Sequence, residues 1–93
     1  MFARVSTIQG KPEKVEEVVR FFEKAVPKGV EGMKGGYFLV NRKTGKIVSI
    51  SLWETEKAMQ ASASTANKIR GQATETAAAA PPTVEIYEVA IQL

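Results

Sequence analysis

The 93-residue sequence contains no cysteine, no histidine and no aspartate, and all ten of its acidic side chains are glutamates. The lack of cysteine excludes disulfides and thiolate nucleophiles. The lack of histidine removes the commonest metal ligand and the commonest general base near neutral pH. An ionisable catalytic group must therefore be Glu, Lys, Tyr or Arg. Because metal sites draw mainly on His, Cys and Asp together with Glu, we expect no metal site.

Long apolar runs and long runs of one charge are also missing. No apolar stretch approaches the roughly 20 residues of a membrane-spanning helix, and Met1–Val5 lacks the basic and apolar segments of a signal peptide. The net charge is +3, and the lysines up to Lys34 are interleaved with glutamates, as on a solvated helix face. We therefore expect no membrane association, no nucleic-acid binding and a cytoplasmic location.

The chain has the length of one domain, and we expect residues 1–93 to form a single unit. Phe2–Gln9 is rich in β-forming residues and predicts a strand, which Gly10-Lys11-Pro12 ends. An apolar stripe at spacings of three and four then predicts a helix that ends at Pro27. This stripe consists of Val15, Val18, Val19, Phe22 and Val26.

The middle of the chain predicts a hairpin. Lys28–Gly36 is rich in glycine and predicts a loop, and Tyr37–Val40 predicts a short strand. A turn over Asn41–Gly45, with Gly45 at positive φ, joins it to a strand over Lys46–Trp53. The two strands must pair, because their connection is too short for another arrangement.

A second helix is expected between Thr55, an N-cap residue, and the Pro81-Pro82 pair. Its inner face is thin and rich in alanine, and we expect a bend or break near Ser62–Thr65 or at Gly71. The inner face consists of Ala58, Met59, Ser62, Ala66, Ile69, Ala73 and Ala77. Val84–Leu93 predicts the last strand.

The order βαββαβ predicts an α+β, ferredoxin-like fold, with both helices on one face of a four-stranded antiparallel sheet. A solvated second face should be polar, yet Val48, Ile50 and Leu52 form an apolar row opposite Ile47 and Trp53. An apolar face needs a cover, and the simplest cover is a second copy about a two-fold axis. We therefore expect a homodimer through the sheet face, with a different protein or a ligand as the alternative cover.

Three stretches resemble the antibiotic biosynthesis monooxygenase (ABM) domain. They are Leu52–Thr55 followed by Glu56-Lys57-Ala58, the hairpin Gly36–Lys46, and the closing Val84–Val89. The resemblance covers nearly the whole chain and implies a dimeric α/β barrel. Some members of this family oxidise polycyclic phenols to quinones with O₂ and without a cofactor. Others degrade haem, and others isomerise their substrates or have no known activity.

The resemblance does not extend to haem degradation. Members that degrade haem use an Asn on the first strand, a Trp at the end of the third strand and a His on the following helix. Trp53 matches that tryptophan, but Phe2–Gln9 contains no Asn and the chain contains no His.

Trp53 and Arg4 are the first candidates for substrate binding, and each has a structural alternative. Trp53 would stack on a planar aromatic ligand, or it closes the core with its N–H bonded to a carbonyl. Arg4 would bind a phenolate or carboxylate or stabilise an oxyanion. Alternatively, it forms an ion pair with Glu85 or Glu88 on a neighbouring strand, or it is an edge residue whose charged end reaches water.

Four further candidates lie on the second helix and on the strands. Asn67 and Arg70 share one helix face, where they either reach a pocket or remain solvated. Tyr37 and Tyr87 would donate hydrogen bonds to a ligand or to the protein itself.

Small side chains on the second helix leave space above the sheet, which a ligand or large residues such as Trp53 and Tyr87 would fill. The leading hypothesis is an ABM-type monooxygenase that acts without a cofactor on an aromatic, phenol-like substrate, with the ionised substrate reacting directly with O₂. No catalytic residue is identified. The rival hypothesis is a non-catalytic dimer that binds a small molecule or a partner, since no ionisable cluster marks a catalytic centre.

Overall fold

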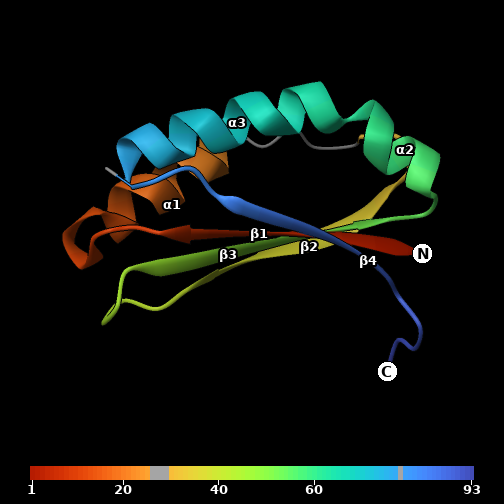
Figure 1. The fold of residues 1–93 in the computed structure, drawn as a ribbon, viewed down its shortest axis with the longest axis horizontal. Coiled ribbons are helices and arrows are strands. Elements are labelled where there is room, and N and C mark those ends of the chain that lie inside the picture. The colour runs from red at the N-terminus through yellow and green to blue at the C-terminus, as the bar shows by residue number, and fades with distance from the viewer. Residues whose placement is uncertain (26–29, 78) are drawn as a thin grey trace.

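The computed structural model describes residues 1–25, 30–77 and 79–93. Its elements are, in order, β1 (Phe2–Gln9), η1 (Pro12–Lys14), α1 (Val15–Ala25), β2 (Met33–Val40), β3 (Lys46–Trp53), α2 (Glu56–Ala61), α3 (Ala63–Thr76) and β4 (Thr83–Glu88). The strands form one antiparallel sheet in the order β2-β3-β1-β4, with the helices on one face (Figure 1). This is the expected α+β, ferredoxin-like fold.

The registers of the central strands, β1 and β3, determine which side chains share a face. Arg4 lies opposite Ser51, Ser6 lies opposite Ser49, and Phe38 of β2 continues the second row. These residues face the helices. The alternate residues point away from the helices and form what we call the open face. Its large apolar and aromatic side chains are Val5, Tyr37, Leu39, Val48, Ile50, Leu52 and Tyr87.

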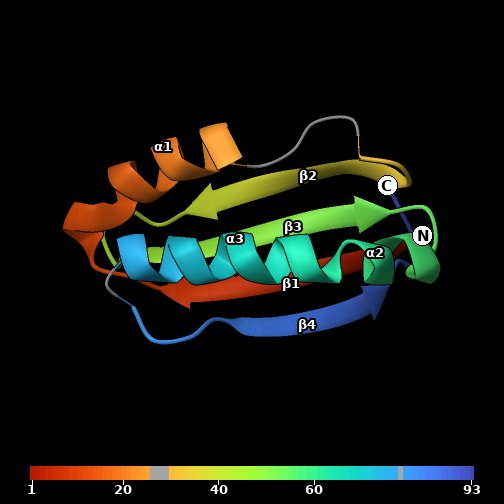
Figure 2. The same ribbon diagram turned by 90° about the horizontal axis from the view of Figure 1, so that it is seen from above.

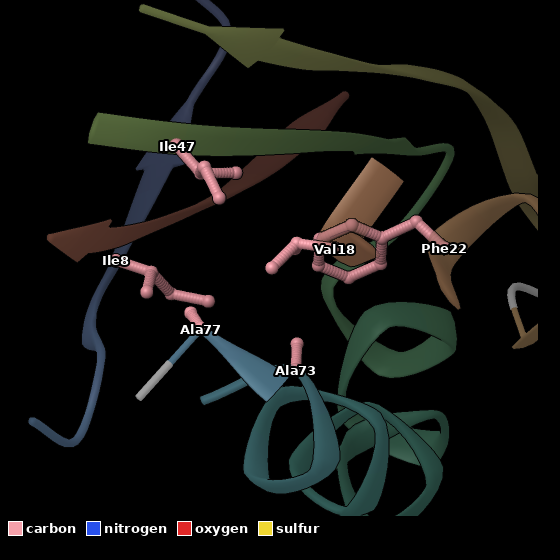
Figure 3. Packing of buried hydrophobic residues seen from close by; sticks show 6 residues of the cluster. All are labelled: Ile8, Val18, Phe22, Ile47, Ala73 and Ala77. Atoms are coloured by element: carbon pink, nitrogen blue, oxygen red, sulfur yellow. The ribbon is translucent and has the colours of Figure 1, made fainter. Parts of the chain in front are cut away.

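The hydrophobic core lies at one end of the helix-facing side. Seen from above, α3 runs along the two central strands and α1 lies toward the β2 edge (Figure 2). Side chains from β1, β3, α1 and the end of α3 point toward one another there (Figure 3). They are Ile8, Val18, Phe22, Ile47, Ala73 and Ala77. Each fully buried valine or isoleucine in this cluster contributes roughly 1.5–3 kcal/mol, so this end holds the helices on the sheet.

The first helix buries the predicted stripe, with Val15, Val18 and Phe22 all buried. Pro12 occupies the first turn of η1, where a missing N–H is tolerated. Val26 and Pro27, the expected end of this helix, lie outside the described residues, as do Lys28 and Gly29.

The hairpin forms as predicted, with one correction at its start. β3 has the expected bounds, and Gly45 adopts a φ of 80°. β2 begins at Met33, within the stretch that predicts a loop. An irregularity in the register between Met33 and Gly35 allows this glycine-rich segment to pair with β3.

The predicted second helix is divided into α2 and α3 at Ser62, which confirms the expected break near Ser62–Thr65. Thr55 caps α2, and its hydroxyl accepts from the Ala58 N–H. Ser62 ends α2, and its hydroxyl donates to the Met59 carbonyl at 2.7 Å. Gly71 causes no second break.

Both C-terminal elements are shorter than expected. α3 ends at Thr76, five residues before Pro81, and the N–H of its C-cap Ala77 still donates to the Ala73 carbonyl. β4 covers Thr83–Glu88 only, although the Val89 N–H still donates to the Met1 carbonyl. Among the described residues, no helix has both the length and the apolar character needed to cross a bilayer.

Candidate functional site

A cleft of about 1160 Å³ lies between the sheet and the α2–α3 pair. Its floor is formed by the helix-facing side chains Arg4, Ser6, Phe38, Ser49, Ser51 and Trp53. The wall from α2 and α3 consists of Lys57, Ala58, Ala61, Ser62, Thr65, Ala66, Ile69 and Arg70. Apart from Lys57, Ile69 and Arg70, these wall residues are small. The space that the alanine-rich helix predicts is therefore present.

Arg4 is the buried cation of the cleft floor, with 7% of its surface exposed. Its Nη2 donates to the Met59 carbonyl at 2.5 Å and to the Ser62 hydroxyl at 2.9 Å. Its guanidinium carbon lies 5.5 Å from the centre of the Trp53 ring, within cation–π range. Arg4 is thus held between the helix break and the only tryptophan.

No carboxylate of the described residues forms an ion pair with Arg4. The alternative of an ion pair with Glu85 or Glu88 is therefore wrong. Glu85 lies opposite Val5, on the other side of the sheet, and its carboxylate accepts a hydrogen bond from Tyr87.

Burial and, secondly, the charge of Arg70 lower the pKa of Arg4 below its ordinary value. An arginine with this direction of shift still carries its charge at neutral pH. Among the described residues, no buried side-chain nitrogen or oxygen lacks a hydrogen-bond partner. Arg4 itself lines the cleft, so its guanidinium forms part of the cleft surface.

Trp53 is buried, with 3% of its surface exposed, and it also lines the cleft. Its Nε1 donates to the Ser51 hydroxyl at 2.8 Å, a side-chain acceptor where a carbonyl is expected. Its two interpretations, as a core residue and as a wall of a binding site, are compatible in this position.

A second aromatic surface comes from Phe38 of β2, which is not among the candidates from the sequence. Its ring stacks on Phe22 of α1, with centroids 4.2 Å apart and planes at 17°. Phe38 is 44% exposed and lines the cleft. The signal for this role is the strand register, which places Phe38 beside Ser49 on the helix-facing side.

The other candidates divide between the cleft and its surroundings. Arg70 lines the cleft, and burial lowers its pKa. Its Nη2 donates to the side-chain oxygen of Asn67, which is exposed and lies outside the lining. Tyr37 borders the cleft at β2, but strand alternation places its ring on the open face, where it is 63% exposed. Tyr87 also lies on the open face, away from Arg4, Trp53 and Arg70.

The chain matches the family model described as "Antibiotic biosynthesis monooxygenase" over residues 1–74. Two uncharacterised proteins from two strains of Mycobacterium tuberculosis are each 32% identical to this chain. The alignment is 93 residues long and covers 97% of this chain. This chain spans 41% of the length of those curated relatives.

Solved structures share the fold. A Streptomyces coelicolor monooxygenase in complex with nanaomycin D has a TM-score of 0.81 and 18% identity, covering 99% of this chain and 89% of its own. A conserved protein from Methanosarcina mazei has a TM-score of 0.76 and 18% identity, covering 92% and 89%. Fold and family model agree with the resemblance seen in the strand and hairpin motifs. The chain belongs to the antibiotic biosynthesis monooxygenase family.

Proposed function

We propose that this chain is a cofactor-independent monooxygenase that oxidises an aromatic, phenolic small molecule in the cleft above the sheet. The observation that carries this proposal is Arg4, a buried cation without a carboxylate partner among the described residues. A buried charge without a counterion is unfavourable for stability, and an anionic ligand would compensate it.

The aromatic surfaces of the cleft support a planar ligand. Trp53 lies beside the Arg4 guanidinium, and the Phe22–Phe38 pair provides a second apolar surface. A flat ring in the cleft would contact aromatic side chains while its ionised oxygen accepts from Arg4. The fold shared with a monooxygenase that was solved with an organic ligand is in keeping with such a site.

The chemistry would use electrons of the substrate itself. The charge of Arg4 lowers the pKa of a phenol or enol held against it and favours the ionised form. The electron-rich anion then reacts with O₂. For a substrate methylene, one oxygen atom becomes the new carbonyl and the other leaves as water with the two hydrogens. The chain binds the anion, orients its ring and excludes bulk water.

Oxygen uptake with anthrone as the probe tests this proposal. Wild-type protein should consume O₂ faster than the buffer and heat-denatured controls. Arg4→Met should lower the rate by about 100-fold, the size of losing one charge-stabilising donor. The exposed Arg20 of α1 provides a matched control, and Arg20→Met should leave the rate unchanged.

Two outcomes would count against parts of the proposal. A thermal shift with anthrone but no oxygen uptake would favour the rival function, a non-catalytic binding protein of the same fold. Unchanged turnover in Trp53→Phe would remove the specific role of Trp53 in stacking.

We also propose that two copies associate through the open face. Tyr37, Leu39 and Tyr87 on this face are 63%, 49% and 49% exposed. With the neighbouring rows of β3 they make an apolar surface that is unfavourable in water. A two-fold axis through the sheet would cover this surface with its own copy.

A further inference from the structure

The cleft contains a second arginine, Arg70, which the proposed reaction does not use. Arg70 lies on α3, in the wall above the floor that holds Arg4. Its Nη2 donates to the Asn67 side chain, which is a neutral acceptor. Within the described ranges, neither arginine forms an ion pair with a carboxylate.

The two arginines leave the cleft interior with an excess of positive charge. Arg70 is close enough for its charge to lower the pKa of Arg4, although burial is the larger cause. The other charged lining residues are Glu31, Lys34, Glu54 and Lys57, which are all exposed, so water screens their charges, and Glu54 lies 3.9 Å from the Lys34 ammonium. A bound ligand with more than one negative charge would neutralise the interior.

A single ionised phenol supplies one negative charge to this pair of cations. We propose that the substrate also carries a carboxylate, which binds Arg70 while the phenol oxygen binds Arg4. This inference rests on the proposed function. A carboxylate suits Arg70 because a guanidinium presents parallel N–H donors that match its two oxygens.

The apolar lining of the cleft indicates what must carry both acidic groups. Ile69, which precedes Arg70 on α3, and the partly exposed Phe38 give the cleft an apolar surface. An aromatic body would fill it, with its two oxygen functions at the arginines. The substrate class is therefore a hydroxylated aromatic acid.

Trp53 provides a reporter for the test, because it is the only tryptophan and it lines the cleft. Its indole N–H gives a single side-chain signal in a proton–nitrogen correlation NMR spectrum. The signal is followed in titrations with hydroxynaphthoate, naphthol and naphthoate under argon, so that binding is measured without turnover.

Hydroxynaphthoate should bind about tenfold more tightly than naphthol, the gain expected of one charge-assisted hydrogen bond. Arg70→Gln should abolish this advantage and leave the affinity for naphthol unchanged. Lys68 is exposed on the same helix and lies outside the lining, so Lys68→Gln should keep the full advantage.

Equal affinities for hydroxynaphthoate and naphthol in the wild-type protein would overturn the inference without any variant. An advantage that survives in Arg70→Gln would overturn it as well. Oxygen uptake decides the proposed function separately. Tighter binding of the carboxylate-bearing ligand without oxygen uptake would support the Arg70 site and reject the monooxygenase. Oxygen uptake without this difference in affinity would support the monooxygenase and reject the Arg70 site.

Discussion

Arg4 occupies a buried position at which an apolar side chain would stabilise the fold more than a charged one does. It is buried beside Trp53 without a carboxylate partner among the described residues, and replacing such a charge by an apolar side chain is often neutral or stabilising. Its main acceptor, the Met59 carbonyl, also accepts from the Ser62 N–H and the Ser62 hydroxyl. If Arg4 is removed, the Met59 carbonyl therefore still accepts hydrogen bonds from Ser62.

We therefore expect Arg4→Met to leave the free energy of unfolding unchanged or to raise it by about 1–2 kcal/mol. The same variant should lose oxygen uptake, because the cleft loses the cation proposed to bind the ionised phenol oxygen. Urea unfolding of wild type, Arg4→Met and the control Arg20→Met measures the first effect. A loss of more than about 2 kcal/mol in Arg4→Met would instead identify Arg4 as a structural clamp between β1 and α2.

Tyr87 provides a pH-dependent contact on the open face. Its hydroxyl donates to Glu85 at 2.5 Å, and this hydrogen bond raises the pKa of Tyr87 above its ordinary value of about 10. The folded state favours the neutral phenol. Its contribution to stability is therefore present below the unfolded pKa and is lost as the pH rises through the raised folded pKa.

Glu85→Gln should lower the pKa of Tyr87, because the negative charge that disfavours the tyrosinate is removed. The tyrosinate absorbance measures the midpoint, in a Tyr37→Phe background so that one tyrosine titrates. Glu88→Gln is the control and should leave the midpoint in place. An unchanged midpoint in Glu85→Gln would mean that the Tyr87–Glu85 bond does not persist in solution.

At the scale of elements, two glycines have opposite roles. Gly45 closes the β2–β3 turn at a φ of 80°, and a Cβ there would clash with the Gly10 carbonyl oxygen and lie 2.7 Å from the Pro12 nitrogen. Gly71 lies inside α3, and a Cβ there would meet no atom within 4 Å. The turn requires its glycine, whereas the helix tolerates one.

Gly45→Ala should lower the free energy of unfolding by about 1–3 kcal/mol through backbone strain and the clash. Gly71→Ala should raise it by about 0.5–1 kcal/mol, because alanine loses less entropy in a helix. Urea unfolding of the two variants checks both signs. A stabilising Gly45→Ala would mean that the turn adopts another conformation in solution.

The α2–α3 pair determines that a cleft exists above the sheet. The core at one end is closed by Ala73 and Ala77 against β1 and β3. Toward the break, the Ser62 hydroxyl contacts Arg4 on the floor, but the neighbouring alanines of the wall leave space above the sheet open. Small side chains thus give close packing at one end of α3 and an open cleft at the other.

At the scale of the molecule, the small core and the apolar open face both favour association. A domain of 93 residues buries a limited share of its surface, and here part of the helix-facing side is a cleft as well. A dimer would add burial that the single chain lacks. The apparent melting temperature should then rise with protein concentration.

Native mass spectrometry should find a dimer of about 20 kDa, twice the 10.1 kDa chain. Ile50→Glu and Leu39→Glu, each with a charge on the open face, should shift the population to monomer. Ser64→Glu adds the same charge to the exposed side of α3 and should leave the dimer intact. A wild-type monomer, or a dimer that survives both open-face variants, would mean that a different surface or partner is involved.

Local patterns in the sequence suffice for most of the elements. The alternation in Phe2–Gln9 and Lys46–Trp53, the turn at Gly45 and the cap at Thr55 each depend on neighbours in the chain. The βαββαβ order then limits the topology to a familiar one. The resemblance to the family rests on local motifs of the same kind, such as the junction after Trp53 and the hairpin Gly36–Lys46.

The site depends on contacts that sequence patterns do not contain. Arg4 reaches the hydroxyl of Ser62, 58 positions away, because β1 is central in the sheet and the helix breaks above it. Its expected partner Glu85 lies on the other face because of the β1–β4 register. The sequence alone determined the strands, the turns and the apolar second face, since these follow from local periodicity. Only the tertiary structure decided which side chains meet in the cleft, since register and helix placement depend on long-range packing.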